Sequence, residues 1–390
     1  MRATAAAALT AFFVVACAQE PAVGVASSSR ASASPSPSPA TLSTKWNCGD
    51  THNGATAVAI FRLAATTPTV ALLDMSNPLK PYLACTLAPA NGAHFLSFTK
   101  VAFWIGDQLG TADLGSGAIK QTARLAAVAS TGAFSVDGTK FAYRSYDAGT
   151  GATATHLYVA GSDRTLYVQE PIGGHGGPGP SFGPFDQLEF SPDGSLLLDY
   201  MAFRPQSAQP NLIVFRTDGS ILFRTNAPGG TWSPTGNTLF FYASDQSGLA
   251  GELDSLGATG HRQVVASGLH GMNWPRMSPD GRTIVYNTSD SSVPECGGVP
   301  HLWSLDLATG RATQISTSIS SGPFFVQPTV VWSDEQKLSP CGPGGPSTPD
   351  GVILAYDLTT GKDSAVDTTP LVQGMPSIST YYLIDGWFAS

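Results

Sequence analysis

The sequence predicts an all-β protein, a β-propeller built from four-stranded blades. Charged residues make up only 12% of the 390 residues, whereas the chain has 42 Gly and 29 Pro, a composition typical of short strands and tight turns. A motif close to Ser-Pro-Asp-Gly recurs before nearly continuous apolar runs. A second type of hairpin recurs seven times, with copies that begin 39 to 55 residues apart, the period expected of propeller blades.

The first residues are predicted to be an export signal. Arg2 precedes an apolar run, Ala3 to Val15, that is too short to span a bilayer. The run ends in VVAC at Cys17, which resembles a bacterial lipobox with Cys17 as the lipidated first mature residue. An ordinary secretory signal is the alternative. We therefore expect residues 1–17 to be a lipoprotein signal peptide and the protein to be exported and lipid-anchored at the bacterial cell envelope.

A tether and one folded domain are expected to follow. Residues 18–43 are dominated by Ser, Ala and Pro and cannot form a core, so they should link the anchor to the domain. The β-propeller is expected over residues 44–390. The formal net charge is −8 and no long basic run occurs, which argues against nucleic acid as a partner.

The Ser-Pro-Asp-Gly motif predicts the turn between the first and second strands of a blade. Pro presets the backbone, Asp suits the next position, and Gly accepts the left-handed conformation that a bulge requires. The apolar runs that follow indicate strands buried on both faces, as in sheets stacked on sheets. The copies lie at residues 134–145, 190–202, 232–244 and 277–290.

The second hairpin predicts the third and fourth strands of each blade. It combines an apolar strand, a turn with Gly or Asn, and a more polar strand. Seven copies favour seven blades, with six as the alternative. They begin at residues 69, 108, 156, 211, 251, 301 and 351.

In these repeats the chain resembles the TolB-like family of β-propellers, relatives of the WD-repeat proteins. The resemblance covers roughly residues 50 to 390. Blade seven departs from it, because Trp332-Ser333 is followed by Asp334-Glu335-Gln336 without a Gly, and we expect a distorted hairpin there. The resemblance implies an interaction role, since TolB is a periplasmic component of a cell-envelope complex.

Blade one lacks a strand in this count. The C-terminal run, residues 377–388, is predicted to supply it by pairing beside Ala57 to Phe61, which would close the ring and remove the open edges.

Loop lengths predict where a ligand binds. The first–second and third–fourth turns of each blade share one face and are short, so we call it the short-turn face. The other connections share the opposite face, here the loop face, and a ligand is expected there around the mouth of the central channel. The long segments are 170–187, 203–210, 289–300, 317–328 and 338–350.

Four cysteines remain after the lipidation site, namely Cys48, Cys85, Cys296 and Cys341. None has Cys-x-x-Cys spacing, which argues against zinc. Export favours two disulfides, for which three pairings exist. We prefer Cys296–Cys341, which lie in equivalent loops of neighbouring blades, and therefore Cys48–Cys85.

Five residues are candidates for ligand binding near the channel mouth: His175, Asp186, His270, Trp274 and Arg276. An imidazole, a carboxylate, an indole and a guanidinium together would suit a polar ligand or peptide. Ordinary roles are the alternatives. Trp274 could pack between blades, His270 could be a solvated loop residue, and Arg276 could pair with an acid near the channel.

A catalytic motif is matched but rejected. Residues 179–183 fit the pattern G-x-S-x-G, which needs a strand before the Ser and a helix after it. Ser181 instead lies in a Gly- and Pro-rich segment, so we assign no catalytic residue. The seven His residues show no ligand spacing, and no metal or cofactor is expected.

Two function classes follow. The preferred one is a non-catalytic binding or interaction module for an envelope protein, a peptide or a glycan. The alternative is a propeller enzyme, a hydrolase, lyase or lactonase with its site at the channel mouth. We expect a monomer that contacts the membrane only through its lipid.

Overall fold

The computed structural model confirms the all-β prediction. It describes residues 45–48, 57–63, 67–169, 186–201, 210–244, 251–269, 271–290, 299–316, 319–336, 352–367 and 381–388. No helix occurs in these ranges, and therefore none that could cross a membrane.

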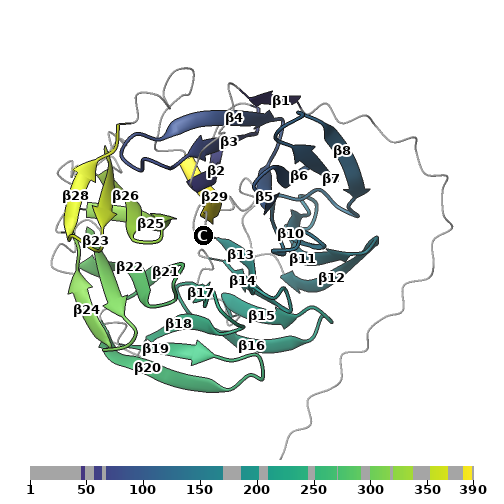
Figure 1. Cartoon of the computed structure of the whole chain (residues 1–390). Coiled ribbons are helices and arrows are strands. Elements are labelled where there is room, and N and C mark those ends of the chain that lie inside the picture. The colour runs from purple at the N-terminus through teal and green to yellow at the C-terminus, as the bar shows by residue number, and fades with distance from the viewer. Residues whose placement is uncertain are drawn as a thin grey trace, which may run out of the picture. The chain divides into compact units, whose positions relative to one another are not determined.

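The described strands form seven antiparallel sheets arranged in a ring, the blades of a β-propeller (Figure 1). From the channel outward, blade 1 contains β29 (Tyr381–Phe388), β2 (Ala57–Leu63), β3 (Thr69–Asp74), β4 (Tyr82–Ala88) and β1 (Lys45–Cys48). Blade 2 contains β5 (Gly92–Ser97), β6 (Lys100–Ile105), β7 (Gln108–Asp113) and β8 (Ile119–Arg124). Blade 3 contains β9 (Thr131–Phe134), β10 (Lys140–Tyr146), β11 (Thr153–Val159) and β12 (Ser162–Gln169). Blade 4 contains β13 (Gln187–Phe190), β14 (Leu196–Tyr200), β15 (Leu212–Arg216) and β16 (Ile221–Thr225).

The remaining three blades repeat this order. Blade 5 contains β17 (Gly230–Trp232), β18 (Leu239–Ser244), β19 (Gly251–Leu256) and β20 (Arg262–Leu269). Blade 6 contains β21 (Asn273–Met277), β22 (Thr283–Asp290), β23 (Val299–Asp306) and β24 (Arg311–Gln314). Blade 7 contains β25 (Ile319–Gln327), β26 (Val330–Gln336), β27 (Val352–Asp357) and β28 (Lys362–Ala365).

The predicted closure of the ring is confirmed. Strand β29 pairs antiparallel with β2, with Ala57 opposite Phe388 and Leu63 opposite Tyr381. Strand β1 adds a fifth, outermost strand to the same sheet by pairing with β4. Blade 1 therefore joins segments from both ends of the described chain.

The Ser-Pro-Asp-Gly turn is stabilised by a fixed set of hydrogen bonds. In blade 6 the hydroxyl of Ser278 donates to Asp280 Oδ1 at 2.6 Å and accepts from the N–H of Thr283 at 2.9 Å. Gly281 has φ +73°, the left-handed conformation that the motif predicts. The copies in blades 3 and 4 share the Ser–Asp bond and the positive φ at Gly, so the motif serves the fold.

Blade 7 corrects two predictions. Its first hairpin does not follow Trp332, because Trp332 lies inside the second strand and the turn falls between Gln327 and Val330. Likewise, residues 317–328 are not mainly a loop, since β25 occupies Ile319–Gln327. The reason is packing. Trp332 is buried against blade 1 and donates its indole N–H to Pro78 O at 3.0 Å.

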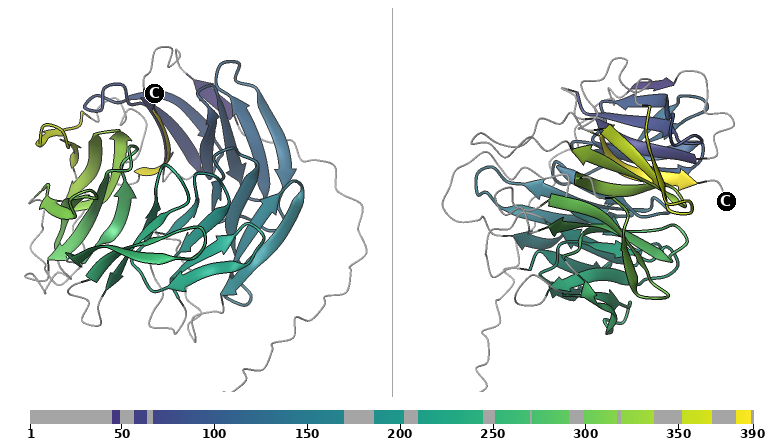
Figure 2. Two further views of the ribbon diagram at one scale, coloured as in Figure 1. Left: turned by 60° about the horizontal axis from the view of Figure 1, so that its bottom comes forward. Right: turned by 90° about the vertical axis from the view of Figure 1, so that its left-hand side faces the viewer.

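Seven clusters of buried apolar residues hold the ring together, one between each pair of neighbouring blades. Figure 2 shows the twisted sheets stacked beside one another from two further directions. Strand β14 is buried at all five positions, as expected for a strand with a blade on each side. The continuous apolar runs in the sequence are thus explained.

Candidate functional site: the central channel of blades 4 to 6

The innermost strands of blades 4, 5 and 6 line one arc of the channel (Figure 1). Each ends in a large side chain, Phe190, Trp232 or Met277, that packs toward the preceding blade. Because side chains alternate along a strand, the residue before each faces the other way. These residues are Glu189, Thr231 and Arg276.

Side chains link these three strands across the blades. The N–H of Gly230 donates to Gln187 Oε1 at 3.1 Å, and the N–H of Met277 donates to Thr231 Oγ1 at 3.0 Å. The Trp232 indole N–H donates to Glu189 O at 3.3 Å. The arc is therefore a rigid support for any group that it presents to the channel.

Trp274 occupies a strained position at the start of β21. Its φ is +50°, which a residue with a side chain adopts rarely. The register between β21 and β22 shifts between Asn273 and Arg276, so Trp274 lies in a β-bulge. Its N–H donates to Pro228 O at 3.4 Å. Strain of this kind is concentrated at binding and catalytic sites, and a bulge changes the direction of the side chain that it carries.

Arg276 is half-buried and has few partners. Its Nη1 donates to Pro275 O at 3.5 Å, and no described acid lies within ion-pair distance. Burial lowers the pKa of Arg276, and the negative charge of Glu189 opposes this effect. Glu189 and Arg276 therefore interact electrostatically, although they belong to sheets separated by blade 5.

Asp186 precedes β13 and does not face open solvent. Its Oδ2 lies 3.4 Å from Arg144 Nη1 on blade 3, and the carboxylate side chain is 7% exposed. The negative charge of Asp186 contributes to a Tyr200 pKa of about 12, an increase caused first by burial. The structure thus brings Asp186 into an ion cluster between blades.

Arg144 is the centre of this cluster, and the sequence analysis missed it. Its Nε donates to Asp199 Oδ1 at 3.0 Å, and its Nη2 donates to Gln187 O at 2.9 Å and Tyr200 O at 2.7 Å. Thr155 donates to the other Asp199 oxygen at 2.5 Å. A sequence signal does exist, because Arg144 and Asp199 are charges among the largely apolar residues of two second strands.

The other predicted site residues differ in what the structure describes. Cys17, His175, His270, Cys296 and Cys341 lie outside the described residues. The register of β1 on β4 places Cys48 directly opposite Cys85, the juxtaposition that the predicted pairing needs. That disulfide stays a prediction. In the described part of the chain, no group of three His, Cys, Asp or Glu could hold a metal ion.

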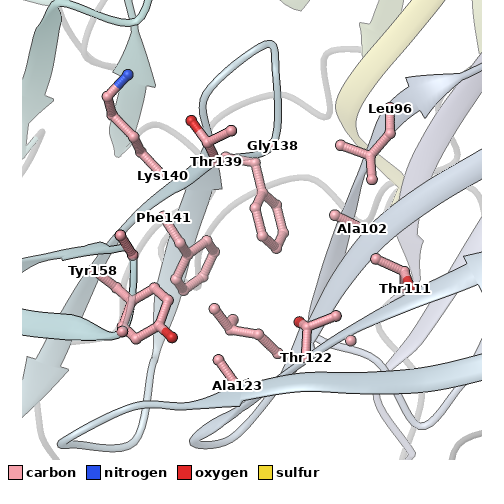
Figure 3. A pocket seen from close by; sticks show the side chains of 15 residues that line it. Leu96, Ala102, Thr111, Thr122, Ala123, Gly138, Thr139, Lys140, Phe141 and Tyr158 are labelled. Atoms are coloured by element: carbon pink, nitrogen blue, oxygen red, sulfur yellow. The ribbon is translucent and has the colours of Figure 1, made fainter.

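A separate cleft of about 200 Å³ lies between blades 2 and 3 (Figure 3). Residues of both kinds of short turn line it, among them Gly138 and Ala160, so it opens on the short-turn face. Phe141 and Tyr158 supply aromatic walls, and Lys140 is the charged side chain in the lining. It lies apart from the residues that the sequence analysis selected.

Comparison with known proteins concerns the fold. No family model matches the chain, and no curated protein does. TolB from Acinetobacter baumannii is 14% identical, with a TM-score of 0.42 over 86% of this chain and 84% of that chain. The putative TolB from Agrobacterium tumefaciens is 13% identical, with a TM-score of 0.39 over 83% of this chain and 89% of that chain. The chain is a seven-bladed β-propeller.

Propellers of several functions are among the structural neighbours of this propeller. An oligogalacturonate lyase from Vibrio parahaemolyticus is 10% identical, with a TM-score of 0.47 over 75% of this chain and 94% of that chain. TolB proteins are among the neighbours, as the turn motif predicts, but so are enzymes. At these identities the likeness shows the fold and not the function.

Proposed function

We propose that this propeller is a lipid-anchored module of the cell envelope that binds a protein, peptide or glycan without catalysis. One observation carries the proposal. Trp274 and Arg276, an aromatic and a charged residue that no turn uses, lie together on β21, the innermost strand of blade 6. The acids of the short turns, such as Asp137 and Asp193, are instead held by hydrogen bonds within the turns.

The enzyme alternative has weaker support. Ser145 Oγ lies 2.8 Å from His156 Nε2, a distance suited to a nucleophile and its base. However, His156 is buried and stacked on Tyr143, and its Nδ1 faces the hydroxyl of Thr165 at 3.3 Å. A hydrolytic triad needs a carboxylate at that position to orient the imidazole.

Anchoring by Cys17 is part of the proposal and is supported by the VVAC run and the Ser-, Ala- and Pro-rich tether. We expect the protein in the membrane fraction, released by detergent and not by salt, because a lipid chain partitions into the bilayer. Cys17→Ser should lose this behaviour. If that variant stays in the membrane fraction unchanged, the lipid anchor is refuted.

Site-specific photo-crosslinking in intact cells tests the binding face. A photoreactive residue at Asp147 or Asn226 reports on the loop face, and one at Asp218 or Thr309 reports on the short-turn face. We expect discrete crosslinked partners from the loop-face positions. Partners captured from the short-turn positions alone would refute the assignment of the binding face.

A further inference from the structure

The channel carries a positive charge that the described residues do not neutralise by direct contact. Arg276 is half-buried, yet its one described hydrogen bond is a long one to the carbonyl of its own neighbour, Pro275. A guanidinium has five N–H donors and prefers a planar oxyanion that can accept two of them. Because a half-buried cation without an ion pair leaves its donors for another partner, its position on an innermost strand indicates a site for an anion.

A second donor is unused on the same arc. Gln187 is 7% exposed, and its Nε2 has no hydrogen-bond partner among the described residues. Its Oε1 is held by Gly230 N–H, which fixes the amide. A Cβ placed on Gly229 would lie 3.0 Å from Gln187 Oε1 and 3.6 Å from Pro275 Cδ. The Gln187 amide and the residue before Arg276 therefore converge on the same point of backbone.

Three backbone N–H groups of this arc, on blades 5 and 6, are not open for a peptide strand. The N–H groups of Gly230, Trp274 and Met277 already donate to Gln187, Pro228 and Thr231. Addition of a strand requires such groups to be free. Recognition at this level must therefore use side chains, which suits a small ligand better than an extended chain.

We propose that the central channel binds a small organic carboxylate, with its two oxygens on the guanidinium of Arg276. The unused Gln187 amide on the same arc offers a further donor, and Trp274, two residues before Arg276, offers a ring for an apolar group next to the carboxylate. This site goes beyond the interaction role proposed above and does not depend on it.

Titration calorimetry of the purified propeller at low salt tests the site. The probes are acetate, benzoate and glucuronate, each compared with its neutral amide. We expect at least one acid to bind and its amide to bind about tenfold more weakly or worse, because a charge-assisted bond to Arg is lost. The acid that binds best distinguishes an aliphatic, an aromatic and a sugar source of the carboxylate.

Three variants test whether affinity for the acid changes in the direction that the site predicts. Arg276→Gln should weaken the acid about tenfold or more, and Arg276→Lys should weaken it less, since an ammonium keeps the charge but not the planar fork. Glu189→Gln should strengthen it, because a negative charge near the site is removed. Arg311→Gln, on the exposed outer strand of blade 6, is the matched control and should change nothing.

The site is refuted if no acid binds better than its amide, or if Arg276→Gln binds like the wild type. A loss of affinity in Glu189→Gln would also overturn it, since that result indicates a cationic ligand. If Arg276→Gln does not fold, the Lys variant and Glu189→Gln still decide the outcome. Partners crosslinked at the loop face in cells would be unaffected by failure of this test.

Discussion

Arg144 shows how a single buried charge can connect two blades. The guanidinium on blade 3 is fully buried, and its hydrogen bonds all reach groups of blade 4. Asp199, its main partner, is 2% exposed. In such a pair each charge is tolerable only while the other is present.

Asp199→Ala should therefore destabilise the protein strongly. We expect a loss of about 3–5 kcal/mol in the free energy of unfolding, because the variant leaves a buried guanidinium without its main counterion. Denaturant unfolding measures it. The matched control is Asp107→Ala, which removes the exposed partner of Arg124 and should cost about 1 kcal/mol or less. Equal losses in the two variants would contradict this role of Arg144.

At this scale the sequence predicts residue types better than partners. Asp186 is selected for its residue type and its position before a first strand, but Arg144 pairs with it, and that contact joins different blades. Arg144 and Asp199 are 55 residues apart, so no local pattern connects them. The strain at Trp274 likewise depends on how β21 meets β22, which a single strand sequence does not encode.

At the scale of elements, the turn between the first two strands of a blade is the unit that the sequence predicts best. Its requirements are local, since Ser, Asp and Gly each satisfy the backbone of the same turn. Blade 7 shows the limit. Trp332-Ser333 imitates the end of a first strand, but burial of the indole against blade 1 places it in the second strand.

Gly281→Val should cost about 1–3 kcal/mol of stability, since a β-branched residue tolerates positive φ poorly. Its Cβ would also lie 3.3 Å from Pro234 Cγ. Gly194→Val should behave similarly, with φ +67°. Gly115→Val is the control, because Gly115 has no positive φ and its nearest contact is 3.6 Å away. Thermal denaturation that ranks Gly115→Val as the most damaging would refute this reading of the turn.

The same turns make stability depend on acid. Hydrogen bonds, led by that from Ser135, lower the pKa of Asp137 to about 2, and those from Ser195, Asn237 and Ser191 outweigh burial and lower that of Asp193 to about 2. Folded-state pKa values below the unfolded value of 3.8 mean that stability is present above about pH 4 and is lost between pH 4 and 2.

Melting temperature measured across this range should fall more steeply for the wild type than for a double variant, Asp137→Asn with Asp193→Asn. The double variant lacks both carboxylates, so protonation cannot remove their contribution to its stability. If melting temperature falls equally steeply with decreasing pH in both proteins, these two carboxylates do not control the loss of stability in acid.

At the scale of the whole molecule, β1 is fastened to the outside of blade 1. It is four residues long, and the predicted Cys48–Cys85 disulfide would hold it on β4. Such a bond should contribute about 2–4 kcal/mol by restricting the unfolded chain. Peptide mapping without reduction checks it. Alkylation of Cys85 in the native, unreduced protein would contradict the pairing, and Cys48→Ser with Cys85→Ser gives the expected loss of stability.

The closure by β29 has a consequence for how the protein reaches its native state. Strand β2 pairs with a strand that follows it by more than 300 residues, so its apolar edge stays unpaired while the other blades are being synthesised. Contacts between such distant segments form slowly, and an unpaired edge in the meantime is a point of aggregation. Folding of this chain should therefore depend on whatever shields β2 until the last strand has been made.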